Sequence, residues 1–150
     1  MGLQQDIMTA LKTAMKAKDQ TALAALRAVK SEILLAQTKS GAKEELSEEE
    51  EIKLLQKLVK QRKDSAAIFT EQNRPDLVEP EVAQAAIIEQ FLPEQLTAEE
   101  IEKVVVMTID DLGASGMKDM GKVMGIVSKE LAGQADGKTI STIIKAKLLN

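Results

Sequence analysis

Residues 119–131 read Asp-Met-Gly-Lys-Val-Met-Gly-Ile-Val-Ser-Lys-Glu-Leu, and the helical pattern of this stretch recurs along most of the chain. Its apolar side chains are spaced three and four residues apart: Met120, Val123, Met124, Val127 and Leu131. That period is typical of a helix that buries one face. The stretch therefore predicts an amphipathic α-helix.

Two further stripes lie beside the apolar one on this helix. One is made of small residues, chiefly Gly121 and Gly125. The other is basic and lies next to the glycines: Lys118, Lys122 and Lys129. A glycine inside a helix costs about 1 kcal/mol relative to alanine, so each of the two needs a reason. Either another helix packs closely on them or a ligand approaches the backbone there, and the sequence leaves both alternatives open.

The composition indicates long helices and excludes several kinds of site. The 150 residues include no Cys, His, Trp or Tyr, only two Phe and three Pro. Such a chain has no disulfide, no thiol nucleophile, no imidazole base and no Cys- or His-ligated metal. We therefore expect an all-α protein without a metal site or a cofactor.

The charge is unevenly distributed. Residues 1–116 carry 14 basic and 21 acidic side chains, a net charge of −7, whereas residues 117–150 carry 6 and 3, a net charge of +3. The overall charge of −4 argues against DNA as a partner, while the basic end favours a polyanion there. The chain starts without the features of a signal peptide and has no apolar run of 18 residues, so we expect a cytoplasmic protein without a membrane partner.

The apolar period and the breaks in it predict a multihelical protein in two parts. Residues 1–92 are expected to form a four-helix bundle, and residues 97–150 a three-helix subdomain. Capping boxes are expected at Ser47 and Thr97, each followed three residues later by a glutamate. Asp136 is the expected N-cap of the last helix, and residues 39–45 are expected to form a polar loop.

The fourth helix is expected at the centre of the bundle. Residues 81–92 are apolar nearly all round, which is typical of a buried helix, and Pro80 suits the first helical position. Arg62 lies within the apolar stripe of the third helix, where a guanidinium group needs an acceptor. Glu89 lies at an edge of the fourth helix, so we expect a structural ion pair between Arg62 and Glu89.

Five stretches, in this order, resemble the YqeY-like (GatB/YqeY) family: Lys60–Ser65, Asp76–Leu77, Phe91–Leu96, Asp119–Met124 and Ala135–Lys138. That family shares its helical region and tail with the B subunit of the glutamine-dependent amidotransferase, which repairs misacylated Asp-tRNA and Glu-tRNA. The resemblance implies a two-part helical fold whose C-terminal part is similar to the tail of that subunit, a tRNA-contacting module.

The basic stripe falls within this tail-like part, so tRNA is the expected partner. The candidate tRNA-binding residues are Lys118, Gly121, Lys122, Gly125, Lys129 and Lys138. Lys138 extends the patch if the last two helices pack antiparallel. Because no aromatic side chain lies nearby, recognition is expected to depend on RNA shape and phosphate contacts.

The family also carries the label of a carbon–nitrogen ligase with glutamine as amido-N-donor, which describes the whole amidotransferase. This chain has no Walker-type glycine loop and no amidase-like set of serines, so no catalytic residue is assigned. Three functions stay open. The favoured one is a non-catalytic tRNA-binding helper in translation. The others are a protein-interaction module that docks on an amidotransferase or an aminoacyl-tRNA synthetase, and an amide-transfer enzyme.

Overall fold

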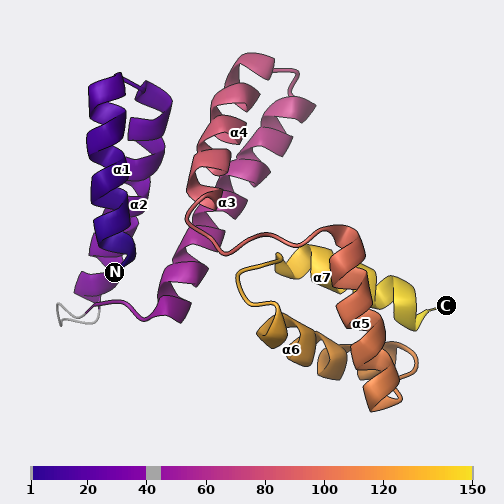
Figure 1. Ribbon diagram of the computed structural model, residues 1–150. Helices are drawn as coiled ribbons and strands as arrows, with labels where there is room; N and C mark the ends of the chain where they lie inside the picture. Colours follow the sequence, from indigo (N-terminus) through magenta and orange to yellow (C-terminus); the bar gives the residue numbers. More distant parts are fainter. Residues whose placement is uncertain (1, 40–44, 150) are drawn as a thin grey trace. The chain divides into compact units, whose positions relative to one another are not determined.

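The chain is all-α in the computed structural model, which describes residues 2–39 and 45–149 (Figure 1). Within these residues there are seven α-helices and one 3₁₀ turn, and no strand. The chain divides into two compact units, Met1–Leu92 and Pro93–Asn150. Most of the loop predicted for residues 39–45 lies outside the described residues.

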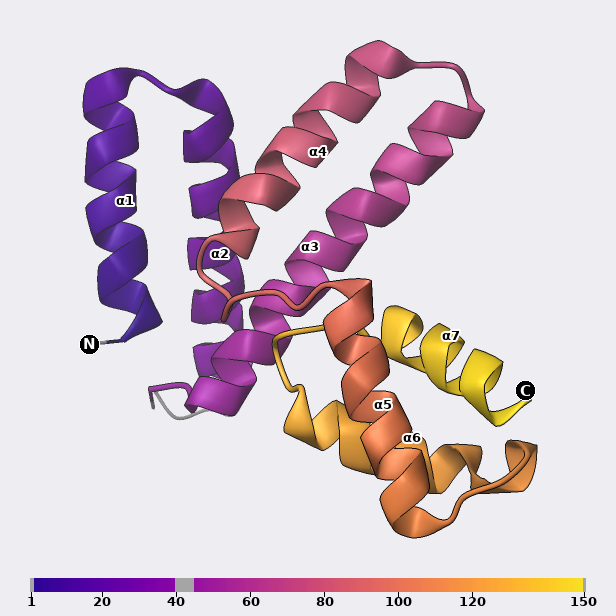
Figure 2. The same cartoon turned by 45° about the vertical axis from the view of Figure 1, so that its right-hand side comes forward.

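The first unit consists of two helical hairpins. Its helices are α1 (Leu3–Ala17), α2 (Gln20–Lys39), α3 (Glu48–Glu71) and α4 (Pro75–Glu89). Helix α1 packs on α2, α3 packs on α4, and α2 joins the two hairpins through contacts with α4 and α3 (Figures 1 and 2). Apolar side chains of all four helices form one core, in which Ile7, Val29, Leu55 and Ile88 are almost completely buried.

Helix α2, and not α4, contributes most to this core. The buried residues of α2 are Leu23, Ala25, Leu26, Val29 and Ile33, whereas α4 buries only Ala85 and Ile88. Val82 of α4 is 52% exposed. The predicted central place of the fourth helix is therefore wrong. The physical reason is that several of its apolar residues are alanines, which lose little when they face water, so apolar composition alone does not fix burial.

Helix α4 also begins earlier than predicted. Pro75 is its first residue, and Pro80 lies inside it. A proline has no amide hydrogen, so Pro80 cannot bond the carbonyl of Asp76 four residues before it. Asp76 is exposed, which leaves water as an acceptable partner for that carbonyl group. The helix therefore continues through Pro80, because Pro75 already satisfies the preference of proline for the first turn.

The predicted caps are confirmed at all three positions. Ser47 Oγ accepts a hydrogen bond from the Glu50 amide at 3.2 Å, and Glu50 Oε2 accepts one from the Ser47 amide at 2.8 Å. Thr97 and Glu100 form the same reciprocal pair at the start of the next helix, with both distances 3.2 Å. Asp136 Oδ1 accepts from the Thr139 amide at 2.6 Å. These side chains satisfy amides that have no partner within their helix.

The second unit contains three helices and a turn: α5 (Ala98–Leu112), η1 (Met117–Asp119), α6 (Met120–Glu130) and α7 (Gly137–Leu148). Each of the three helices packs on the other two. Helices α6 and α7 run in opposite senses in both views (Figures 1 and 2). Their shared core includes Val105, Val123, Val127 and Ile144, none of which has any exposed surface.

Candidate nucleic-acid interface

Helix α6 presents its lysines to solvent because its apolar stripe faces the core of the second unit. Val123 and Val127 are completely buried, and Leu131, just after the helix, is also buried. With a rotation of about 100° per residue, Lys122 and Lys129 lie on the opposite side of the helix. Both lysines are exposed. The predicted basic stripe is thus a solvent-facing surface.

Lys118 precedes this helix. It lies in the 3₁₀ turn Met117–Asp119, whereas α6 starts at Met120. The angle predicted for Lys118 from a continuous α-helix therefore does not apply, because a 3₁₀ turn has three residues per turn. Gly116 adopts a φ of 72°, a left-handed conformation that favours glycine, and it sets the direction of the turn. Lys118 is exposed, at the N-terminal end of the same helix.

The lysine side chains here have no partner within the chain. Among the residues that the structure describes, Lys118, Lys122, Lys129 and Lys138 form no ion pair and no side-chain hydrogen bond. One nearby carboxylate, that of Asp119, accepts a hydrogen bond from the Ser115 amide at 2.8 Å. The four ammonium groups are therefore available to an external anion.

Gly121 and Gly125 are exposed, and no neighbour requires them to be glycine. A Cβ atom built at either position meets nothing within 4 Å in the part of the chain that the structure describes, its own helix backbone aside. Close packing of another helix of the chain, one of the two predicted alternatives, therefore does not explain them. The open backbone at both positions leaves room for a ligand. We call Lys118, Gly121, Lys122, Gly125 and Lys129 together the lysine–glycine surface.

Lys138 lies on the neighbouring helix, as the second residue of α7, and is exposed. Its neighbour Gly137 is close to the middle of α6, because a Cβ atom there would lie 4.0 Å from Cε of Met124. The structure thus brings the start of α7 beside α6, whereas Lys138 itself makes no direct contact with the lysines of α6 in the described part of the chain.

The comparison with known proteins identifies the family. A family model described as "Yqey-like protein" matches residues 4–148. The chain belongs to the YqeY-like family. The predicted resemblance is therefore confirmed over nearly the whole sequence.

Curated relatives of this YqeY-like chain include two fungal proteins named "Altered inheritance of mitochondria protein 41, mitochondrial". The one from Pyrenophora tritici-repentis is 33% identical over 138 residues, which cover 90% of this chain and 75% of the relative. The one from Kluyveromyces lactis is 35% identical over 147 residues, covering 96% and 72%. Both similarities therefore include the two units.

A third relative is a glutamyl-tRNA(Gln) amidotransferase subunit of Thermococcus gammatolerans. It is 37% identical over 73 residues, which cover 46% of this chain and 12% of the archaeal protein. The matched length exceeds that of Pro93–Asn150, so the similarity includes part of the first unit. The resemblance named a B subunit, whereas the printed name of this relative gives it a different letter.

Within the described residues of this YqeY-like chain, no helix has both the length and the apolar character needed to cross a bilayer. The printed names of the two fungal relatives place those proteins in mitochondria. The cytoplasmic location stays a prediction.

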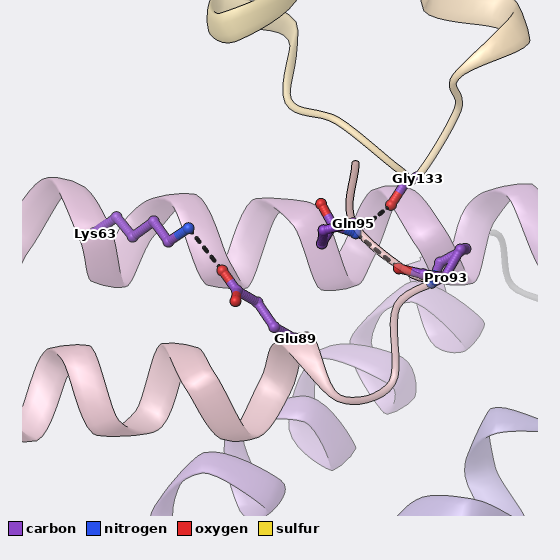
Figure 3. A network of polar contacts seen from close by, with 5 residues as sticks. All are labelled: Lys63, Glu89, Pro93, Gln95 and Gly133. Atoms are coloured by element: carbon purple, nitrogen blue, oxygen red, sulfur yellow. Dashed lines mark hydrogen bonds and ion pairs between the residues drawn. The ribbon is translucent and has the colours of Figure 1, made fainter. Parts of the chain in front are cut away.

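The structure gives Arg62 a different partner from the one predicted. Its Nε donates to Gln84 Oε1 at 3.2 Å, and its Nη1 donates to the backbone carbonyl of Leu58 at 3.1 Å. Glu89 pairs instead with Lys63 at 2.6 Å (Figure 3). The predicted Arg62–Glu89 pair is therefore wrong, although the half-buried guanidinium group does find acceptors. Gln84 satisfies it without a second buried charge, which lowers the cost of desolvation.

One positioning contact in the second unit was not predicted. Gln95 Nε2 donates to the carbonyl oxygens of Gly133 and Pro93, at 2.6 and 2.9 Å (Figure 3). The Leu96 amide donates to the carbonyl of Gln134 at 2.9 Å. Together they tie the segment before α5 to the turn between α6 and α7. The signal in the sequence is weak, because a glutamine between two helices has many possible partners.

Proposed function

We propose that this YqeY-like protein is a non-catalytic tRNA-binding helper that contacts the phosphate backbone through its lysine–glycine surface, extended by Lys138. The observation that carries the proposal is the combination of unpaired ammonium groups with exposed glycines on one helix. Phosphates attract the cations, and the missing side chains at Gly121 and Gly125 let a backbone approach closely.

The relationship to an amidotransferase supports tRNA as the particular polyanion. The printed name of the archaeal relative concerns a tRNA-linked reaction. The lysine–glycine surface contains no aromatic ring on which a base could stack, so recognition by shape and phosphate contacts suits it. The net charge of −4 for the whole chain makes tight binding to any nucleic acid unfavourable. Affinity for tRNA is therefore expected to be modest.

The test is the binding of unmodified full-length protein to a fluorescently labelled tRNA, measured by anisotropy over a series of salt concentrations. Three or four phosphate contacts predict a slope of log K against log[salt] of about −2 to −4. An equally long duplex DNA serves as the comparison. No measurable binding to tRNA at low ionic strength would overturn the proposal.

A second candidate function is association with an amidotransferase, and exposed apolar side chains on the second unit favour it. Met107 of α5 and Ile126 of α6 are 65% and 41% exposed. Apolar contacts release few counterions, so this association would depend little on salt, unlike binding to phosphates. An assay with ATP, glutamine and misacylated tRNA tests the ligase label directly, since amidated product formed by the purified protein alone would make it an enzyme.

A further inference from the structure

A second surface with a distinct chemistry lies in the first unit, between the C-terminal half of α2 and the first half of α3. It is a groove of about 580 Å³. Apolar side chains on its floor come from both helices: Leu35 and Ala36 from α2, and Leu54 from α3. Lysines stand at its rim: Lys39, Lys53 and Lys57.

The floor of the groove is incompletely covered by the chain itself. Leu35 is 61% exposed, more than any other large apolar side chain described in the first unit. A single exposed leucine is common on protein surfaces. Here, however, it is beside Ala36 and faces Leu54 across a concave surface, which is how an apolar anchor of a partner is received.

The rim carries more positive charge than the chain neutralises. Glu32 is the one carboxylate among the lining residues, and it lies 4.0 Å from Lys57 Nζ. Lys53 pairs with Glu49 at 3.1 Å, but both side chains are more than 70% exposed, so the pair is weak. Lys39 has no ion-pair partner among the described residues. The rim therefore complements a negatively charged partner.

We propose that this groove docks an acidic amphipathic helix of a partner protein. Apolar side chains at spacings of three and four residues would contact Leu35 and Leu54, and flanking carboxylates would contact the three lysines. A phosphate backbone fits poorly, because it offers nothing apolar to the floor. A small anionic ligand fits poorly as well, since an open groove cannot bury most of its surface.

This inference does not depend on RNA binding, because the groove belongs to the first unit and the lysine–glycine surface to the second. The experiment displays a library of helical peptides, each of about three turns with randomised outward positions, and selects it on the full-length protein. The expected winners carry Asp or Glu on both sides of an apolar stripe. Leu35→Glu is expected to weaken their binding about tenfold or more, since it removes the apolar contact and repels the acidic flanks.

Leu34→Glu is the matched control. It places the same charge on the adjacent residue of the same helix, at a leucine that is 49% exposed and outside the groove lining. Binding of the selected peptides should be unchanged by it. Lys53→Glu combined with Lys57→Glu should weaken binding mainly through a slower association. Thermal melts of all variants establish that the fold is kept.

Four outcomes would overturn the inference. The selection could enrich no peptide, or only basic ones, or peptides that bind Leu35→Glu as well as the wild type. Self-association that depends on Leu35 would make a second copy of the chain the occupant. A loss of tRNA binding in Leu35→Glu, with an unchanged melt, would make the groove part of an RNA surface.

Discussion

The side-chain amide of Gln95 donates a 2.6 Å hydrogen bond to the backbone carbonyl of Gly133, 38 residues further along the chain (Figure 3). Gly133 is buried and has a φ of 80°, a left-handed conformation that favours glycine. The bond thus fixes a tight turn between α6 and α7. Because the candidate RNA-binding lysines lie on these two helices, the turn also sets where they stand.

Gln95→Ala is therefore expected to loosen the second unit by about 1 kcal/mol, the usual net contribution of one hydrogen bond. Hydrogen exchange at the Leu96 amide, which donates to the Gln134 carbonyl, measures this loosening. Gln90→Ala is the control, since Gln90 is exposed and its side chain makes no hydrogen bond within the described residues. Equal protection of the Leu96 amide in both variants would contradict the expectation.

Charge reversal on α6 tests the RNA surface. Lys122→Glu combined with Lys129→Glu should weaken tRNA binding several-fold and reduce the salt slope by about 2, one for each lost phosphate contact. The melting temperature should stay nearly constant, because both lysines are exposed and unpaired in the described structure. Lys12→Glu with Lys16→Glu on α1 makes the same change of charge in the first unit. If this control weakens binding equally, the effect is one of net charge and not of a site.

The glycines allow a test of shape that is separate from charge. Gly125→Ala adds a methyl group where nothing lies within 4 Å, so it should stabilise the protein by about 1 kcal/mol through helix propensity. Gly125→Leu should be tolerated by the fold for the same reason. Its bulk should nevertheless weaken tRNA binding, which a titration of the two variants side by side measures. Equal affinity in Leu and Ala variants would show that the backbone is not approached there.

A charge in the core of the first unit should unfold it. Ile88 has no exposed surface, so Ile88→Asp places an unpaired carboxylate among apolar side chains at a cost of roughly 4 kcal/mol or more. Val82→Asp is the matched substitution on the same helix, at a residue that is 52% exposed. Circular dichroism during urea denaturation compares them. A cooperative transition unchanged in Ile88→Asp would contradict the observed packing.

Two adjacent cations on α3 should differ in their contribution to stability. Arg62 is half-buried and donates to Gln84 and to the Leu58 carbonyl, so Arg62→Ala should cost about 1–3 kcal/mol. Lys63 pairs with Glu89 but is 59% exposed, so Lys63→Ala should cost less than about 1 kcal/mol. Denaturation of both variants under the same conditions decides the order. A larger loss for Lys63→Ala would reverse this assignment.

Features set by neighbours in the chain could be read from the sequence. The caps at Ser47, Thr97 and Asp136 depend on a side chain and an amide three residues away, and all three are found as predicted. Apolar spacing likewise identified the helices and the buried face of α6. These interactions form within a single turn and need no knowledge of how the helices pack.

Features set by packing could not be read in the same way. The partner of Arg62 depends on the register of α3 against α4, which brings Gln84 and not Glu89 to the guanidinium group. The burial of α4 depends on which sides its neighbours cover. Whether Gly121 and Gly125 face another helix or open space is also a question of packing, and the sequence supports either reading equally well.

The two open glycines have a consequence for the persistence of the surface that they form. Helix α6 has eleven residues, which is too short to be stable alone, and the glycines weaken it by about 2 kcal/mol more relative to alanine. Its local unfolding should therefore need less free energy than that of α5, which has no glycine. A bound polyanion would oppose this opening. The element that carries the lysines is thus also the one that a ligand would stabilise most.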